Sequence, residues 1–235
     1  MSIVKHHSEW LSLMSGDVSG PFLTMPVLEE FFPDGLDSID ASVTSPLRQA
    51  FEDWVANPVG AQHAWVNFVL QSLLGFPSSD IVSDQAIPPQ CLAELPEFSE
   101  TVRPDYALIE PAQGSKQRAP FFLINVYKPG TKLEAPLAGS RSSWSPAQRM
   151  AELCKASKVG LGLVTDGERW MLVHAPWGQT VTYVSWYASL WLEERLTLQA
   201  FITLLHHRRF FGLAEDETLL KLMERSAHEQ HRVTD

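Results

Sequence analysis

The chain has 235 residues, of which 45% are hydrophobic and 20% charged, and its net charge is −10 at pH 7. This length and composition suit one globular α/β domain with helical appendages. The negative charge argues against a protein that binds nucleic acid over its whole surface, and no apolar run approaches the roughly 18 residues of a membrane span.

The N-terminal region predicts helices separated by irregular chain. Residues 1–16 offer one apolar side and predict a short helix. Residues 17–45 are rich in Pro, Gly and Asp and predict irregular chain with one helical turn over 27–32. A second helix is expected over 46–56, with Ser45 as its N-cap and Pro46 at its first helical position.

Residues 61–100 predict one more helix and then a region of turns. The helix is strongly apolar and ends at Gly75. Four prolines within 77–100 indicate turns, and we expect a strand near 80–84 followed by a loop and a short helix. Three acids in this region are expected to be solvated rather than to bind a metal: Glu94, Glu97 and Glu100.

Two apolar runs, 103–111 and 120–130, predict neighbouring buried strands joined by a hairpin loop. The first run carries Asp105 near its start, and the second ends in Lys-Pro-Gly. A carboxylate on one strand and a polar pair near the end of the next can build a hydrolytic Mg²⁺ site. The cation then polarises a phosphate and activates a water molecule.

A polar linker precedes the next helix. The Ser-Pro-Ala-Gln segment at 145–148 forms a capping box, and the helix that it begins is expected to end near Ser157. Arg149 is placed on the outer side of this helix. A strand at 159–165 follows, and Asp166-Gly167 predicts a two-residue hairpin turn into a strand at 168–176.

The C-terminal part predicts a strand over 180–187, a helix over 198–207 capped by Thr197, and an amphipathic helix over 214–235. Trp170 is expected in the core or at its edge. Packing is favoured over base stacking for an aromatic group made of Trp177, Trp186, Tyr187 and Trp191.

Cysteine and histidine usage indicates a reduced protein without a zinc site. Cys91 and Cys154 cannot build a disulfide framework, and the N-terminus lacks a signal-peptide core, so we expect buried thiols and a cytoplasmic location. No Cys/His cluster has zinc spacing. Two adjacent histidine pairs are expected at the surface: His6-His7 and His206-His207.

Several motifs occur in an order that resembles a known family. They are Pro104-Asp105, the Leu-Ile-Asn-Val-Tyr-Lys-Pro-Gly run ending at Gly130, the Ser-Pro capping box and the Asp-Gly hairpin. Together, over about residues 46–235, they resemble the PD-(D/E)xK nuclease-like domain at the N-terminus of restriction-modification and phage-defence proteins that carry an adenine methyltransferase. The resemblance implies a restriction-endonuclease-like α/β fold, in which helices flank a central mixed sheet and form N- and C-terminal extensions.

The resemblance also implies a domain organisation. We expect an N-terminal extension over 1–45, the nuclease-like domain over 46–212, and a C-terminal helix over 213–235 that leads toward a methyltransferase region. The Asn/Asp-Pro-Pro-aromatic motif of an adenine methyltransferase is absent, and so is a glycine-rich cofactor loop after a strand, so this chain alone is not expected to methylate.

In this family the second strand commonly carries Glu-x-Lys before Pro-Gly. Here Asn125 takes the position of the acid and Tyr127 that of the lysine. Asn cannot supply negative charge to a divalent cation, and neutral Tyr cannot supply a positive charge. The resemblance therefore implies an altered catalytic site of Asp105, Asn125, Tyr127 and Lys128, with Asp105 as the remaining metal ligand. The residues alone leave another interpretation open, in which Asp105 caps a strand or turn and Asn125 and Tyr127 form hydrogen bonds.

Basic residues gather around this site. Residues 116–169 have a net charge of +5, whereas the remainder has −15. Such a segment is the footprint of a phosphate-backbone contact, although a solvated helix face with loop charges would have the same composition. The candidate DNA-binding residues are Lys128, Lys132, Arg141 and Arg149.

These observations favour a nuclease-like domain that engages DNA in a restriction-modification or phage-defence system and is inactive or weakly active. Mg²⁺ is the expected cofactor if cleavage survives, and otherwise none is expected. DNA and a downstream methyltransferase domain or partner subunit are the expected partners. The alternatives are a scaffold that docks protein without touching DNA, and a residual Mg²⁺-dependent endonuclease.

Overall fold

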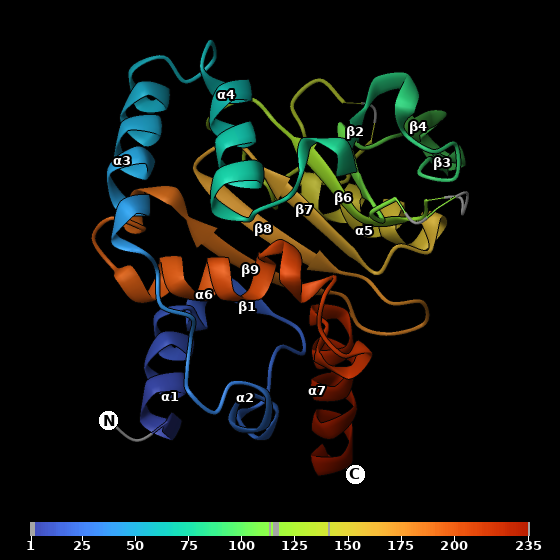
Figure 1. The fold of residues 1–235 in the computed structure, drawn as a ribbon. Coiled ribbons are helices and arrows are strands. Elements are labelled where there is room, and N and C mark those ends of the chain that lie inside the picture. The colour runs from blue at the N-terminus through green and yellow to red at the C-terminus, as the bar shows by residue number, and fades with distance from the viewer. Residues whose placement is uncertain (1–2, 113, 115–117, 141, 235) are drawn as a thin grey trace. The chain divides into compact units, whose positions relative to one another are not determined.

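The computed structural model describes residues 3–112, 114, 118–140 and 142–234 (Figure 1). Its contacts divide the chain into two compact units. The helical unit contains the chain up to Phe76 and from Val184 onward, and the sheet unit contains Pro77–Tyr183. These limits differ from the expected domain boundaries at residues 46 and 212.

The protein is a mixed α/β protein with one seven-stranded sheet in the order β1-β9-β8-β7-β6-β5-β2, and a separate two-stranded sheet of β3 and β4. The strands are β1 (Val18–Ser19), β2 (Ile81–Ser83), β3 (Ala93–Leu95), β4 (Glu100–Val102), β5 (Tyr106–Ile109), β6 (Pro120–Val126), β7 (Leu161–Thr165), β8 (Arg169–His174) and β9 (Thr182–Tyr187).

The sheet unit is built on an antiparallel meander and one parallel crossover. β2, β5 and β6 pair antiparallel, as the two apolar runs predicted for β5 and β6. Helix α5 (Pro146–Ser157) then carries the chain to β7, which lies parallel to β6, and β8 returns antiparallel. The inner face of α5 packs with these strands in one hydrophobic cluster that includes Met150, Leu153 and Leu123.

Local signals placed several of these elements correctly. The capping box of α5 is present, because Ser145 accepts from Gln148 N and the Gln148 side chain accepts from Ser145 N, and the helix ends at Ser157 as predicted. The predicted two-residue turn after β7 is wrong. The register pairs Thr165 with Trp170, so residues 166–169 connect the paired positions. Within this longer connection, Asp166 Oδ1 accepts from the backbone N–H groups of residues 168 and 169.

The small sheet of β3 and β4 was not predicted. Its two three-residue strands are joined by a 3-10 turn, Pro96–Phe98, and by Ser99, which adopts a left-handed conformation with φ 49°. Short strands between prolines give no clear period of two, and for this reason the sequence suggested only a loop and a short helix.

The helical unit contains most of the helices. They are α1 (Ile3–Leu13), α2 (Met25–Phe31), α3 (Ala41–Ala56), α4 (Gln62–Asn67) continued by the π-helix η2 (Phe68–Leu73), α6 (Arg195–Leu205) and α7 (Leu219–Thr234). The expected start of α3 at Pro46 is wrong. Asp40 accepts from Ser42 N and begins the helix a full turn earlier, so that Pro46 lies inside it.

Two further helix starts also differ from prediction. α6 begins at Arg195, and the Thr197 hydroxyl donates to the Glu194 carbonyl instead of capping the helix. The last helix begins at Leu219 instead of residue 214, because a 3-10 turn over Glu215–Glu217 precedes it. In each case the polar residues near the start form local bonds of their own.

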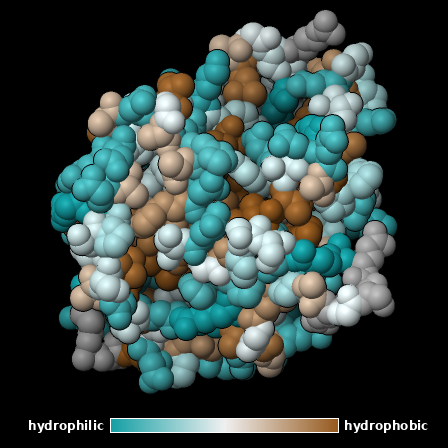
Figure 2. Space-filling model, turned by 45° about the horizontal axis from the view of Figure 1, so that its top comes forward, coloured by the Kyte–Doolittle hydropathy of each residue, from teal (hydrophilic) through white to brown (hydrophobic). Residues whose placement is uncertain are grey.

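Most of the aromatic side chains pack in cores, as expected. Trp170, Trp186 and Trp191 are buried, and in the helical unit the rings of Trp191 and Phe201 lie 4.6 Å apart. Trp177 is the exception, with 83% of its surface exposed on the loop after β8. On the face that Figure 2 shows, hydrophilic residues surround several hydrophobic areas.

The surface position predicted for the first histidine pair is wrong for His7. His7 is buried, its Nε2 lies 2.9 Å from the Phe32 carbonyl, and its Nδ1 accepts from the Trp10 indole. This pairing requires neutral imidazole, and burial lowers the pKa of His7. Both thiols are free and buried, as predicted, and burial raises the pKa of Cys91 to about 11.

Within the described part of the chain, no helix combines the length and apolar character needed to cross a bilayer.

Candidate functional site

The sheet unit brings Asp105 and Asn125 together, as expected for one site shared by two neighbouring strands. Asp105 directly precedes β5, and its backbone N–H donates to the Ile124 carbonyl at 2.9 Å. The Asn125 Nδ2 donates to Asp105 Oδ2 at 3.3 Å, and the Val126 N–H donates to the same oxygen at 2.7 Å. The carboxylate thus lies against the C-terminal end of β6 and is fixed by two donors.

The Asn125 amide acts as a hydrogen-bond donor to the Asp105 carboxylate. Its side chain is buried, and its Nδ2 also donates to the Arg103 carbonyl at 3.1 Å. Although Asp105 is exposed as a residue, burial of its carboxyl group raises its pKa, opposed by the bonds from Val126 and Asn125. The charge of Asp84 raises the pKa of Asp105 further.

These residues do not fit a Mg²⁺ site. Proteins usually bind Mg²⁺ through one or two carboxylates together with water and phosphate oxygens. Here Asp105 Oδ2 accepts from an amide NH₂ and a backbone N–H, and neither Asn125 nor Tyr127 supplies a second carboxylate. Among the described residues there is no group of three His, Cys, Asp or Glu side chains that could hold a metal. Asp84 is an acid near Asp105 that the sequence did not single out, because it lies outside the two motif strands.

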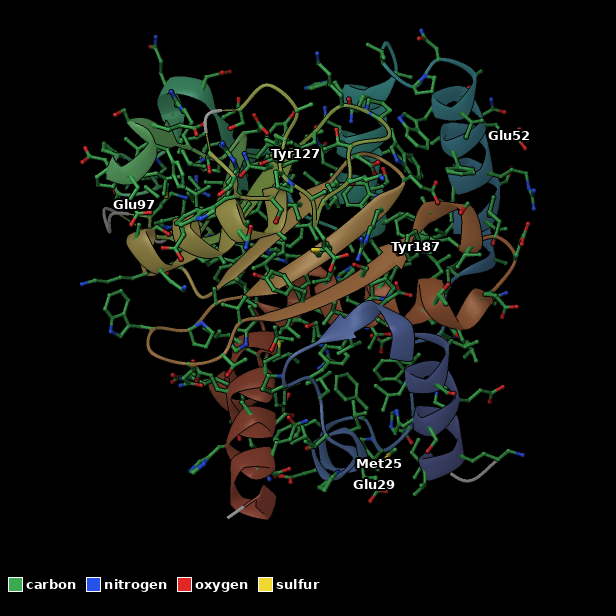
Figure 3. The ribbon with its side chains drawn as sticks, turned by 180° about the vertical axis from the view of Figure 1, so that it is seen from behind. Met25, Glu29, Glu52, Glu97, Tyr127 and Tyr187 are labelled. Atoms are coloured by element: carbon green, nitrogen blue, oxygen red, sulfur yellow. The ribbon has the colours of Figure 1, made fainter. Side chains whose placement is uncertain are left out.

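Tyr127 follows the last residue of β6 and is labelled in Figure 3. Its backbone N–H donates to the Thr165 carbonyl at 2.7 Å, and its half-buried ring packs against the hydrophobic cluster of the sheet unit. Burial raises the pKa of Tyr127 to about 12. The phenol therefore stays neutral near pH 7 and cannot replace the positive charge of a lysine.

Lys128 and Lys132 line a surface hollow of about 550 Å³ that begins beside Tyr127. The turn between them is fixed by two bonds to the Lys128 carbonyl, from Thr131 N at 3.1 Å and Thr131 Oγ1 at 2.7 Å. Gly130 adopts φ +80° and donates its N–H to Asp166 Oδ2 at 3.1 Å. The Lys-Pro-Gly motif therefore forms an anchored turn, and Lys128 and Lys132 on either side of Gly130 both line the hollow.

Ion pairs neutralise several cations of the basic segment 116–169. Arg118 pairs with Asp80, and Lys155 pairs with Glu152. Further pairs join Arg149 to Glu100 and Arg169 to Glu134. Lys116 and Arg141 lie outside the described residues. Of this segment's cations that the structure describes, three form no ion pair within the described chain: Lys128, Lys132 and Lys158.

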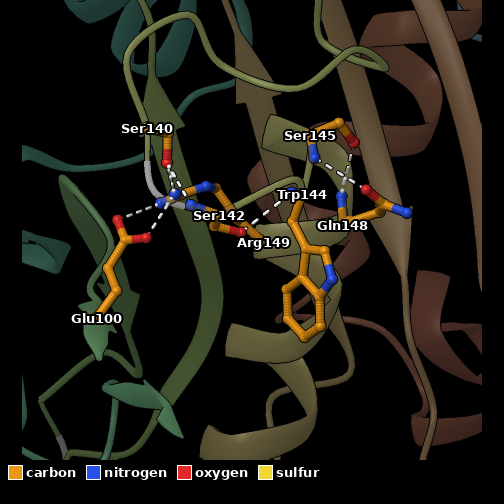
Figure 4. Close-up of polar contacts among 7 residues, drawn as sticks. All are labelled: Glu100, Ser140, Ser142, Trp144, Ser145, Gln148 and Arg149. Carbon is orange, nitrogen blue, oxygen red and sulfur yellow. Dashed lines mark hydrogen bonds and ion pairs between the residues drawn. The ribbon is translucent and has the colours of Figure 1, made fainter. Parts of the chain in front are cut away.

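Arg149 does not lie on the outer side of α5, as the sequence had suggested. Only 6% of its surface is exposed, and it forms two parallel bonds to Glu100 on β4, at 2.8 and 2.7 Å (Figure 4). Its Nη2 also donates to Ser140 Oγ at 2.7 Å. The guanidinium is enclosed by the small sheet that the sequence had missed, so a direct phosphate contact loses its physical basis.

We compared the chain with protein-family models, curated proteins and solved structures, and none of them matches it.

Changing Asn125 to Asp is expected to make stability depend more steeply on pH. The new carboxylate would lie against Asp105, so both folded-state pKa values would exceed their unfolded values. Stability is then fullest below the unfolded pKa of about 4 and falls as pH rises through the folded pKa values. At pH 7 the lost donor alone should lower the free energy of unfolding by about 1–3 kcal/mol.

Urea unfolding at pH 4 and pH 7 measures this effect. Asn125→Ala is the matched control, because it removes the same donor without adding charge. It should be destabilised by similar amounts at both pH values. Equal losses for Asn125→Asp at the two pH values would mean that the carboxylates at 105 and 125 do not interact.

Proposed function

We propose that the sheet unit is a nuclease-like module that holds DNA without hydrolysing it, as part of a restriction-modification or phage-defence system. The strand topology supports this proposal. An antiparallel meander, a helical crossover and a parallel strand place Asp105 and Asn125 side by side, as the resemblance to PD-(D/E)xK domains implies.

The observation that carries the proposal is the position of two lysines. Lys128 and Lys132 are exposed, form no ion pair within the described chain, and line one hollow beside the altered site. Phosphates bind such groups by releasing counterions, so a local pair of unpaired cations is effective although the whole chain is acidic.

The chemistry of the site favours binding over cleavage. Hydrolysis of a phosphodiester by this class of site needs a cation to activate water and to neutralise developing charge. Here Asp105 is held by hydrogen-bond donors, and neither Asn125 nor Tyr127 supplies a charge. Such a module would position DNA for a methyltransferase, which is the partner that the family resemblance implies.

A salt titration tests this function. Fluorescence anisotropy with a labelled DNA of random sequence should show binding in the range of nonspecific contacts, with a dissociation constant of about 10⁻⁴–10⁻⁶ M, and log K should fall linearly with log salt. Lack of binding at low salt, about 20–50 mM, would reject the proposal and favour protein docking.

A further inference from the structure

The hollow beside Tyr127 is lined by two chemically different kinds of residue. Lys128 and Lys132 supply positive charge. A short apolar segment, which we call the wall, also lines it and is formed by Ala135, Pro136, Leu137 and Ala138. A duplex backbone offers only phosphate and sugar and would leave this apolar wall without a partner.

The wall is fixed in place before any ligand binds. Leu133 is buried in the hydrophobic cluster, and its carbonyl accepts from Ala147 N of α5 at 3.0 Å. At the other end, the Ser140 hydroxyl accepts from the buried Arg149 (Figure 4). Because the wall is held at both ends, little conformational entropy is lost when a ligand binds, as in a preformed pocket.

The size of the hollow matches a small ligand. Its volume of about 550 Å³ lies within the roughly 300–1,000 Å³ that small-molecule pockets occupy. One unstacked nucleotide has the chemistry that this lining requires, with an anionic phosphate for the lysines and a flat base for the apolar wall. Tyr127 also lines the hollow.

We infer that this hollow receives a single nucleotide of an unpaired DNA strand. This inference rests on the proposed function and adds that the module prefers single-stranded ends or gaps to continuous duplex. The lysines hold the phosphate next to the inserted nucleotide, and Pro136 and Leu137 contact its base. A free nucleotide has the same chemistry, but lacks the neighbouring phosphates and should bind more weakly.

The test compares three probes on the same protein: a labelled single-stranded oligonucleotide, a blunt duplex of equal length, and an unlabelled deoxynucleoside monophosphate as competitor. The single strand should bind about tenfold more tightly than the duplex, the effect expected for one stacked base. The monophosphate should compete only at much higher concentration. If the monophosphate competed at concentrations as low as those at which the single strand binds, the ligand would be a free nucleotide and the inference would be wrong.

Two variants separate this inference from the proposed function. Ala138→Trp fills the hollow at an exposed position without changing charge, and Ala138→Ser is its control. The Trp variant should lose about tenfold in single-strand affinity and keep its duplex affinity. Equal binding of both probes by the wild type, or no effect of Ala138→Trp, would overturn the nucleotide pocket alone. Absence of binding to either probe at low salt would overturn the proposed function as well.

Discussion

Replacing Lys128 and Lys132 together by Glu is expected to lower the affinity for single-stranded DNA by roughly a hundredfold at low salt. Both side chains are exposed and form no ion pair within the described chain, so the reversal acts on DNA rather than on folding. The slope of log K against log salt should fall by about 1.4, since each phosphate contact on a single strand contributes about 0.7.

Lys5→Glu with Arg48→Glu is the matched control. These residues are exposed on α1 and α3 of the helical unit, and the double change alters net charge by the same amount. Anisotropy titrations should show a small uniform loss and an unchanged salt slope for the control. Equal losses in both double variants would mean that general repulsion, and not the hollow, determines binding.

Arg149→Ala is expected to cause the largest loss of stability. It removes a buried guanidinium that binds Glu100 twice and Ser140 once, and it leaves the Glu100 carboxylate without this cation. Breaking a buried pair in this way typically costs about 3–5 kcal/mol. The Glu100 side chain is 30% exposed, so water can recover part of its solvation and the value should lie at the lower end.

Equilibrium unfolding in urea measures this loss as a shift in the midpoint. The double variant Arg149→Leu with Glu100→Leu leaves no unpaired charge and should be clearly more stable than Arg149→Ala. If Arg149→Ala lost less than about 1 kcal/mol, the range of an exposed salt bridge, then the pair would not hold β4 and the wall of the hollow to α5.

The parts of the site that sequence reasoning placed correctly depend on short-range rules. The two apolar runs predicted neighbouring strands, and the resemblance put Asp105 and Asn125 in one site across them. The two side chains do meet, through the bond from Asn125 Nδ2. The capping box at Ser145 fixed the start of α5, because both of its bonds lie within four residues. Neither inference needed knowledge of distant segments.

The errors arise where a distant segment decides the outcome. Arg149 was placed outside because it is charged, but β4 brings Glu100 against it from 49 residues away. His7 is buried because the Phe32 carbonyl, 25 residues away, accepts its hydrogen. In both cases a tertiary partner satisfies a polar group that would otherwise remain in water, and no local pattern reveals that partner.

A single experiment addresses the central claim that this site holds DNA without cutting it. Supercoiled plasmid is incubated with the wild-type protein in Mg²⁺ and separately in Mn²⁺, and the bound and nicked fractions are read from the same samples. We predict that the protein retards the plasmid in the gel and that the plasmid stays supercoiled with either metal. Nicking that disappears in Asp105→Ala would contradict the claim, because it would show that the altered site still performs metal-dependent hydrolysis.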